Sequence, residues 1–100
     1  MKVSRNEYPL SITVNGLKIE AVIIDPHYQE KHSSIINDEL ILKIVRTLDG
    51  EYHDYADDKP PYQYFVKDEI EFNNKYYRLI WLLEENQFYT GVVNAFRSSK

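Results

Sequence analysis

Residues Tyr76–Arg97, YYRLIWLLEENQFYTGVVNAFR, form the longest apolar stretch of the chain and predict two antiparallel strands. Aromatic and β-branched residues favour strands, and the polar residues Glu84–Gln87 interrupt the stretch once, as a hairpin turn does. Both faces of the two strands carry apolar groups, so we expect the pair at the centre of a sheet with something packed on each side. Arg78, Asn94 and Arg97 are the polar exceptions, and a cation in apolar surroundings needs a partner. These three residues are therefore the first candidates for function.

The length of the hairpin turn decides which residues Arg78 meets. A three-residue turn places Arg78 opposite Asn94, whereas a two-residue turn places it opposite Val93 and on the same face as Arg97. Two roles stay open for Arg78. It is either a structural cation paired with a carboxylate such as Glu69 or Glu71, or a clamp for an oxyanion or a phosphate, because a guanidinium presents a fixed fork of donors.

Composition predicts one ordinary folded domain, residues 1–100. The chain is 43% hydrophobic and 28% charged, without the bias typical of disorder. It contains no cysteine, which excludes disulfides and thiolate metal sites and fits a cytoplasmic protein. The N-terminus has no apolar run typical of a signal peptide, and no segment approaches the roughly 20 apolar residues of a membrane span. The net charge of −4 disfavours non-specific nucleic-acid binding.

An N-terminal β-hairpin is predicted around Asn15–Gly16. This dipeptide lies between two alternating runs, Leu10–Val14 and Leu17–Ile23, and both of its residues tolerate the positive φ that a two-residue turn requires. The turn would place Ile12 opposite Ile19.

One main amphipathic helix is predicted to follow. Asn37 is a suitable N-cap, and Asp38 and Glu39 lie in the first turn, where the helix dipole favours anions. Asp49–Gly50 ends the helix. Its apolar stripe consists of Ile36, Leu40, Ile41, Ile44, Val45 and Leu48. One apolar stripe is enough to cover one side of a sheet.

The segment Glu51–Pro61 is acidic, contains tyrosines and reads as a loop. Tyr62–Val66 and Glu69–Phe72 follow as two strands or as one bent strand, and Asn73–Asn74 forms a turn. Together with the preceding elements, this predicts an α+β domain: an N-terminal β-hairpin, and one main helix packed on an approximately four-stranded antiparallel sheet.

The histidines offer two candidate sites. His32 stands between Lys31 and Ser33, ahead of the helix, and either acts as a general acid or base or is a surface residue near the helix start. His53 lies in the acidic loop, where it is either solvated or part of a weak cation site. No recognised metal-ligand spacing, phosphate loop or dinucleotide fingerprint is present, so we predict no metal and no cofactor.

Tyr52, Tyr55, Tyr62 and Tyr64 crowd the acidic loop and the strand after it. Aromatic side chains on an exposed sheet face stack nucleic-acid bases, and at a sheet edge they pack half-buried. Both readings remain open for these four tyrosines.

The order of motifs resembles the Barnase–EndoU–colicin–RelE-like nucleases found in phages and toxins. From Ile23 to Arg97 the chain shows HxxxxHS ahead of a capped helix, then YxYFV, YRLIWLLE and YTGVVNAFR. The resemblance implies a helical segment against a four-stranded antiparallel sheet. It also implies a cytoplasmic endoribonuclease, a toxin or effector, that cleaves RNA without metal by activating the ribose 2′-hydroxyl.

The same resemblance implies roles for individual residues. His32 would be the general acid or base, and Arg97 and Arg78 would bind the scissile phosphate. The supporting hydrogen-bonding groups would be Asn94, Ser33 and Tyr64. The expected partners are RNA, such as a tRNA loop, and a protein inhibitor or antitoxin. The chain departs from the strongly basic members of the family, because it is net acidic and has four arginines.

The alternative is a non-catalytic protein-interaction domain. Its acidic, tyrosine-bearing loop Glu51–Pro61 would meet a basic protein partner, because complementary charge and aromatic side chains are typical of interfaces.

Overall fold

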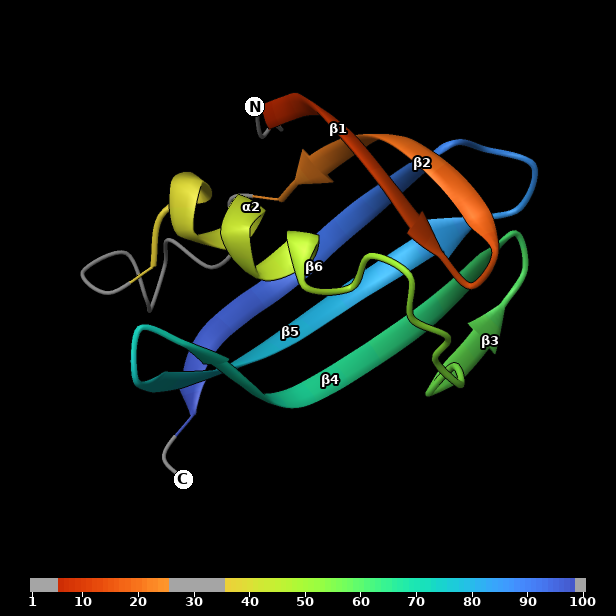
Figure 1. Ribbon diagram of the computed structural model, residues 1–100. Helices are drawn as coiled ribbons and strands as arrows, with labels where there is room; N and C mark the ends of the chain where they lie inside the picture. The colour runs from red at the N-terminus through yellow and green to blue at the C-terminus, as the bar shows by residue number, and fades with distance from the viewer. Residues whose placement is uncertain (1–5, 26–35, 99–100) are drawn as a thin grey trace, which may run out of the picture.

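Six strands and one helix make up the described part of the chain, residues 6–25 and 36–98, in a computed structural model (Figure 1). The helix is α2 (Asp38–Arg46). The strands are β1 (Asn6–Val14), β2 (Leu17–Ile24), β3 (Asp57–Lys59), β4 (Tyr62–Phe72), β5 (Lys75–Glu84) and β6 (Tyr89–Ser98). They form a single sheet in the order β1-β2-β6-β5-β4-β3. Neighbouring strands are antiparallel except β2 and β6, which run parallel.

The predicted four-stranded antiparallel sheet with a main helix was wrong. The sheet has six strands and is mixed, and the helix is short. The N-terminal hairpin joins the sheet because Ala21–Ile24 pairs in parallel with Tyr89–Val92, and Asp57–Lys59 forms an edge strand inside the expected loop. The β2–β6 pairing joins segments far apart in the sequence and leaves no local pattern, which is why the sequence did not indicate this pairing.

The register of the N-terminal hairpin is confirmed. Asn15 and Gly16 have φ of 53° and 76°, and Ile12 lies opposite Ile19. The positive φ values match the right-handed twist of the flanking strands, so this turn closes the hairpin without splaying it.

Helix α2 begins at the predicted N-cap, but it ends at Arg46, before the predicted stop at Asp49–Gly50. The side chain of Asn37 accepts a hydrogen bond from the Leu40 backbone N–H at 2.8 Å, as an N-cap does. Ile41, Ile44 and Val45 are buried against the sheet. The helix covers one face, which we call the inner face, and the opposite face is the outer face (Figure 1).

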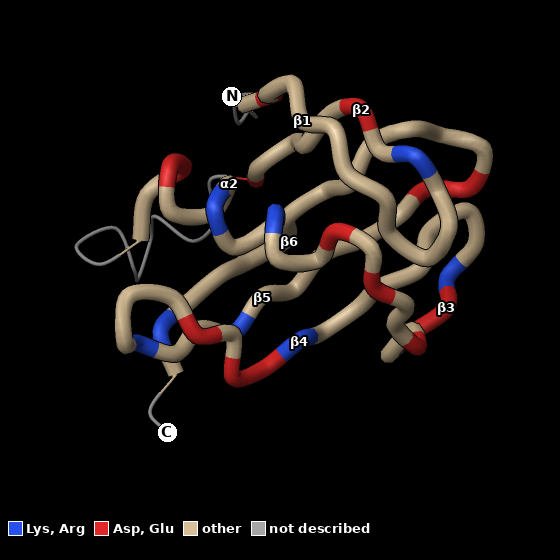
Figure 2. The backbone as a smooth tube through the Cα atoms, viewed as in Figure 1, with Lys and Arg blue, Asp and Glu red and all other residues tan. Residues whose placement is uncertain are grey.

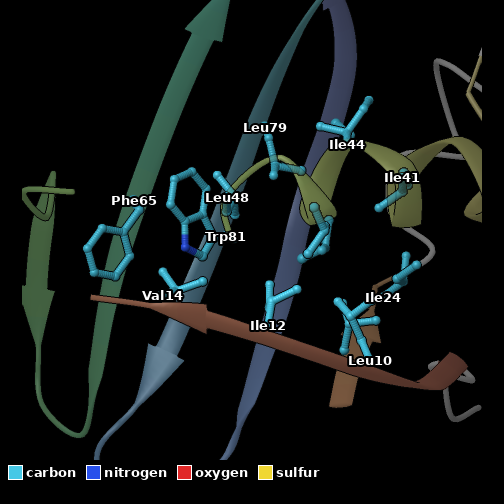
Figure 3. Packing of buried hydrophobic residues seen from close by; sticks show 14 of the residues in the cluster. Leu10, Ile12, Val14, Ile24, Ile41, Ile44, Leu48, Phe65, Leu79 and Trp81 are labelled. Carbon is cyan, nitrogen blue, oxygen red and sulfur yellow. The ribbon is translucent and has the colours of Figure 1, made fainter. Parts of the chain in front are cut away.

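The core lies between α2 and the inner face of a strongly curled sheet. Figure 3 shows β1 crossing the strands β4, β5 and β6 with apolar side chains between them. Trp81 of β5 is fully buried and stacks on Phe65 of β4, with 5.3 Å between ring centroids. Along β5 the inner-face residues are buried and the alternate outer-face residues only half-buried. In residues 6–25 and 36–98, no helix or strand packs on the outer face.

The β5–β6 hairpin has neither of the two registers considered from the sequence. β5 ends at Glu84 and β6 begins at Tyr89, which leaves a four-residue turn, and the register then shifts once between Ile80 and Trp81. As a result Arg78 lies opposite Phe96 and Asn94 lies opposite Ile80. An extra residue of this kind changes which side chains meet without changing the strand pattern in the sequence.

Strand β4 is the single bent strand that the sequence left open. Its register with β5 shifts between Lys67 and Ile70, and Glu69 in this bulge has a φ of 56°. The turn Asn73–Asn74 has positive φ at both residues, as expected.

Candidate functional site

The candidate site residues predicted from the sequence do not lie together in the structure. His32 and Ser33 lie outside the described residues. Arg78, Asn94 and Tyr64 lie on the outer face of the sheet, because they alternate with the buried residues of their strands or pair with outer-face neighbours. Arg97 lies opposite the buried Tyr77, on the inner-face side at the exposed end of β6. Three of the predicted residues thus share one face, and Arg97, the other arginine expected to bind phosphate, lies on the opposite side.

Arg78 is a cation on the outer face of β5. Its guanidinium carbon lies 6.0 Å from the centroid of the Phe96 ring, within the range of a cation–π contact. Its Nε atom is buried, and it has no hydrogen-bond partner in the part of the chain that the structure describes. The carboxylate pairing considered for Arg78 is not found among the ion pairs of the described residues.

A groove of about 230 Å³ crosses the outer face between β4 and β2. Tyr62 and Tyr64 form one wall, with 6.3 Å between their ring centroids, and Tyr89 of β6 stands on the other side. Leu82 of β5 forms part of the floor. It lies against Gly91 so closely that a Cβ atom there would come within 3.0 Å of its Cδ1 atom. We call this the outer-face groove.

The β1–β2 turn, the β5–β6 turn and the segment that contains β3 lie together at one end of the molecule, which we call the loop end and define as residues 15–18, 51–61 and 84–88 (Figure 1). Backbone hydrogen bonds join them: Glu85 N–H donates to Pro61 at 2.8 Å, and Asn15 N–H donates to Glu51 at 3.0 Å. Four of the five large apolar side chains that are exposed in the described residues lie here. They are Leu17, Tyr52, Tyr55 and Phe88, which are 47%, 79%, 52% and 63% exposed.

The loop end also carries the negative charge of the protein. It contains six acidic and two basic side chains, so its formal charge of −4 equals that of the whole chain. Figure 2 shows acidic residues on β3 and in the β5–β6 turn at this end. A second groove of about 630 Å³ lies between these turns, lined by apolar residues such as Leu17, Pro61 and Phe88 and by Asp58 and Glu85.

His53 is part of a packed cluster, and the expectation that it is a solvated loop residue was wrong. Its side chain is 16% exposed, and its ring lies edge-on to Trp81 at 5.1 Å between centroids. Its Nε2 atom is 3.1 Å from Oε1 of Glu51, but the geometry is not that of a hydrogen bond. The same carboxylate oxygen accepts a hydrogen bond from Lys67 Nζ at 2.7 Å.

This cluster attaches the start of the 51–61 segment to two strands. The Asn15 side chain accepts a hydrogen bond from the His53 N–H at 2.6 Å and donates one to the His53 carbonyl at 3.0 Å. Lys67, which lies on β4, donates its hydrogen bond to the Glu51 side chain. The imidazole is packed on Trp81 rather than aimed into a groove, so we assign the cluster a structural role. The sequence carried no signal for it, because its members meet only through the curl of the sheet.

The remaining chemistry of the described residues is sparse. They contain no group of three His, Asp or Glu side chains that could hold a metal ion. Within the same residues, α2 is too short to cross a bilayer, and no other helix long and apolar enough to do so is found. Comparison with family models, curated proteins and solved structures found no match.

Proposed function

We propose that this chain is a protein-interaction domain whose loop end binds a basic segment of a partner protein in the cytoplasm. The proposal is carried by one observation: four of the five exposed large apolar side chains of the described residues lie at the loop end, and the formal charge of the loop end equals the net charge of the chain. Aromatic and apolar anchors supply affinity at interfaces, while complementary charge accelerates encounter and selects the partner.

The groove of about 630 Å³ between the turns, which we call the loop-end groove, is where the partner would bind. Leu17, Pro61 and Phe88 offer apolar surface that a partner side chain would bury, at about 25 cal/mol per Å² of apolar area. Asp58 and Glu85 line the same groove and would face lysine or arginine residues on either side of that anchor. A peptide with an apolar residue between basic ones is therefore the fitting ligand class.

Binding of such peptides tests the proposal. We expect synthetic peptides that alternate Lys or Arg with Leu or Phe to bind the protein in a fluorescence-anisotropy titration, and to bind more weakly as salt is raised. The double variant Asp58→Lys/Glu85→Lys should bind at least about tenfold more weakly, because two attractive charges become repulsive. Phe88→Ser should weaken binding by removing the most exposed part of the groove's apolar surface.

A matched variant separates the loop end from net charge alone. Glu39→Lys/Glu71→Lys changes the net charge by the same amount, but the two residues lie exposed on α2 and β4, away from the loop end. We expect it to bind as the wild type does. Equal weakening by both double variants, or no binding by any peptide, would contradict the proposal.

Metal-independent endoribonuclease activity, which the resemblance implies, is a second candidate. The observation that favours it is Arg78, whose buried Nε lacks a hydrogen-bond partner among the described residues and which shares the outer face with Asn94. We expect cleavage of total RNA in EDTA that Arg78→Ala, Arg97→Ala and His32→Ala abolish and that Arg46→Ala on α2 leaves intact. Absence of cleavage, or cleavage unchanged in the three variants, would exclude it.

A further inference from the structure

We propose that the outer-face groove binds an alkylammonium group, in the form of a small organic cation or of a lysine side chain. This site does not depend on the proposed function, because it lies on the outer face of the sheet and its walls include Tyr64 and Tyr89, which do not line the loop-end groove.

The first argument is the aromatic content of the groove. Three tyrosines line it: Tyr62 and Tyr64 from β4, tilted by 56° to one another, and Tyr89 from β6. The face of an aromatic ring attracts a cation through its quadrupole, and several rings around one space are the usual recognition device for quaternary and alkylated ammonium groups. Half-buried rings strengthen this attraction, since the cation is partly removed from water on binding.

The second argument is charge. Asp25 lines the groove. At the β5–β6 end, the Tyr89 hydroxyl donates a hydrogen bond to Glu84 Oε1 at 2.5 Å, and Glu84 lies opposite Tyr62 in the sheet. Among residues 6–25 and 36–98, no lysine or arginine lines the groove. The nearest outer-face cation on β5, Arg78, is four residues from Leu82, roughly 13 Å along a strand. A cation is therefore favoured over an anion or a neutral group.

The third argument is the shape of the floor. Gly91 has no Cβ, and Leu82 lies flat in the space that a side chain there would need. This keeps the floor low between the tyrosine walls. The groove of about 230 Å³ is smaller than the roughly 300–1,000 Å³ of drug-sized pockets, so it suits one headgroup or one side chain.

Titration with choline, with its neutral isostere 3,3-dimethylbutan-1-ol, and with short peptides carrying lysine or trimethyl-lysine tests the proposal. We expect chemical-shift changes in Tyr64 and Tyr89 with the cations and not with the isostere. Which cation binds more tightly identifies the source, a free molecule or a protein side chain. Equal binding of the isostere, or no binding of any cation at millimolar concentration, would overturn the proposal.

Substitutions test which residues bind the cation. Tyr64→Leu and Tyr89→Leu should each weaken cation binding about tenfold, whereas Tyr64→Phe, which keeps the ring, should retain most of it. Gly91→Ala should also abolish binding by lifting Leu82 into the groove, and a thermal melt checks that this variant folds. Tyr55→Leu, at an exposed loop tyrosine outside the groove, is the control. A loss of binding in Tyr55→Leu equal to that in Tyr64→Leu would contradict the assignment.

Because Tyr64 and Tyr89 stand outside the loop-end groove, this site and the proposed function fail separately. Tyr64→Leu and Tyr89→Leu should leave the basic-peptide titration at the loop end unchanged. Asp58→Lys/Glu85→Lys should leave choline binding unchanged, since neither residue lines the outer-face groove.

Discussion

Asn15 has two roles in this protein: it closes a turn and it anchors a second segment of the chain. Its φ of 53° closes the β1–β2 hairpin, and its side chain makes two hydrogen bonds to the backbone of His53. Those bonds fix the segment that carries the exposed Tyr52, whose hydroxyl lies near Gly16. The position of an exposed loop-end tyrosine thus depends on an amide in a different turn.

Two substitutions separate the roles of Asn15. Asn15→Gly keeps the freedom to adopt positive φ and loses the side-chain bonds, so we expect a loss of about 1–3 kcal/mol in the free energy of unfolding. Asn15→Ala also places an alanine in the left-handed region, which adds about 1–2 kcal/mol. Urea denaturation measures both. A glycine variant as stable as the wild type would show that the bonds to His53 contribute nothing.

At the scale of elements, α2 depends on its first turn. Nine residues are few for a helix in water, so the Asn37 cap and the packing of its apolar side carry much of its stability. The cap is a local feature, and its contribution can be tested without disturbing the core.

We expect Asn37→Ala to lower the free energy of unfolding by about 1 kcal/mol, because the Leu40 N–H loses its acceptor. Asn37→Ser offers another oxygen at the same position and should stay close to the wild type. Chemical denaturation followed by circular dichroism gives both values. If serine is as damaging as alanine, the amide has a role other than capping.

The elements that the sequence predicted correctly are those fixed by neighbours along the chain. Asn15–Gly16 set the first hairpin, and Asn37 and the apolar stripe set the helix, since turn and cap preferences act over a few residues. The parallel pairing of β2 with β6 was missed because nothing within either strand specifies a distant partner.

Of the two candidate sites, the sequence indicates only the loop end. The acidic, tyrosine-bearing segment of the loop end is visible in the composition of Glu51–Pro61 alone. The outer-face groove was not, because Tyr64 and Tyr89 meet only across β5, in a register altered by a bulge. Tyr64 was singled out, but for a catalytic role, and Tyr89 was passed over.

In the whole molecule, Trp81 connects the sheet to the loop end. It is fully buried, stacks on Phe65 and supports the ring of His53, so it contacts both the core and the segment that precedes β3. Its Nε1 atom has no hydrogen-bond partner in residues 6–25 and 36–98. Its contribution is therefore one of packing.

Trp81→Ala should destabilise the protein by about 3–5 kcal/mol, the range for removing a large buried aromatic side chain. Trp81→Phe should lower the free energy of unfolding by clearly less, because it keeps a ring against Phe65 and removes no hydrogen bond. Thermal unfolding followed by far-ultraviolet circular dichroism compares the two. Similar losses in both variants would mean that the indole N–H has a partner after all.

The pairing of Ala21 with Tyr89 sets the order in which this protein can be assembled during synthesis. While the ribosome is still translating the C-terminal strand, the first hairpin and the β4–β5 pair each exist with an open edge that only β6 can fill. The nascent polypeptide therefore exposes two unpaired strand edges until β6 has been made. A chaperone, or fast translation of β6, would protect these edges from pairing with a neighbouring chain.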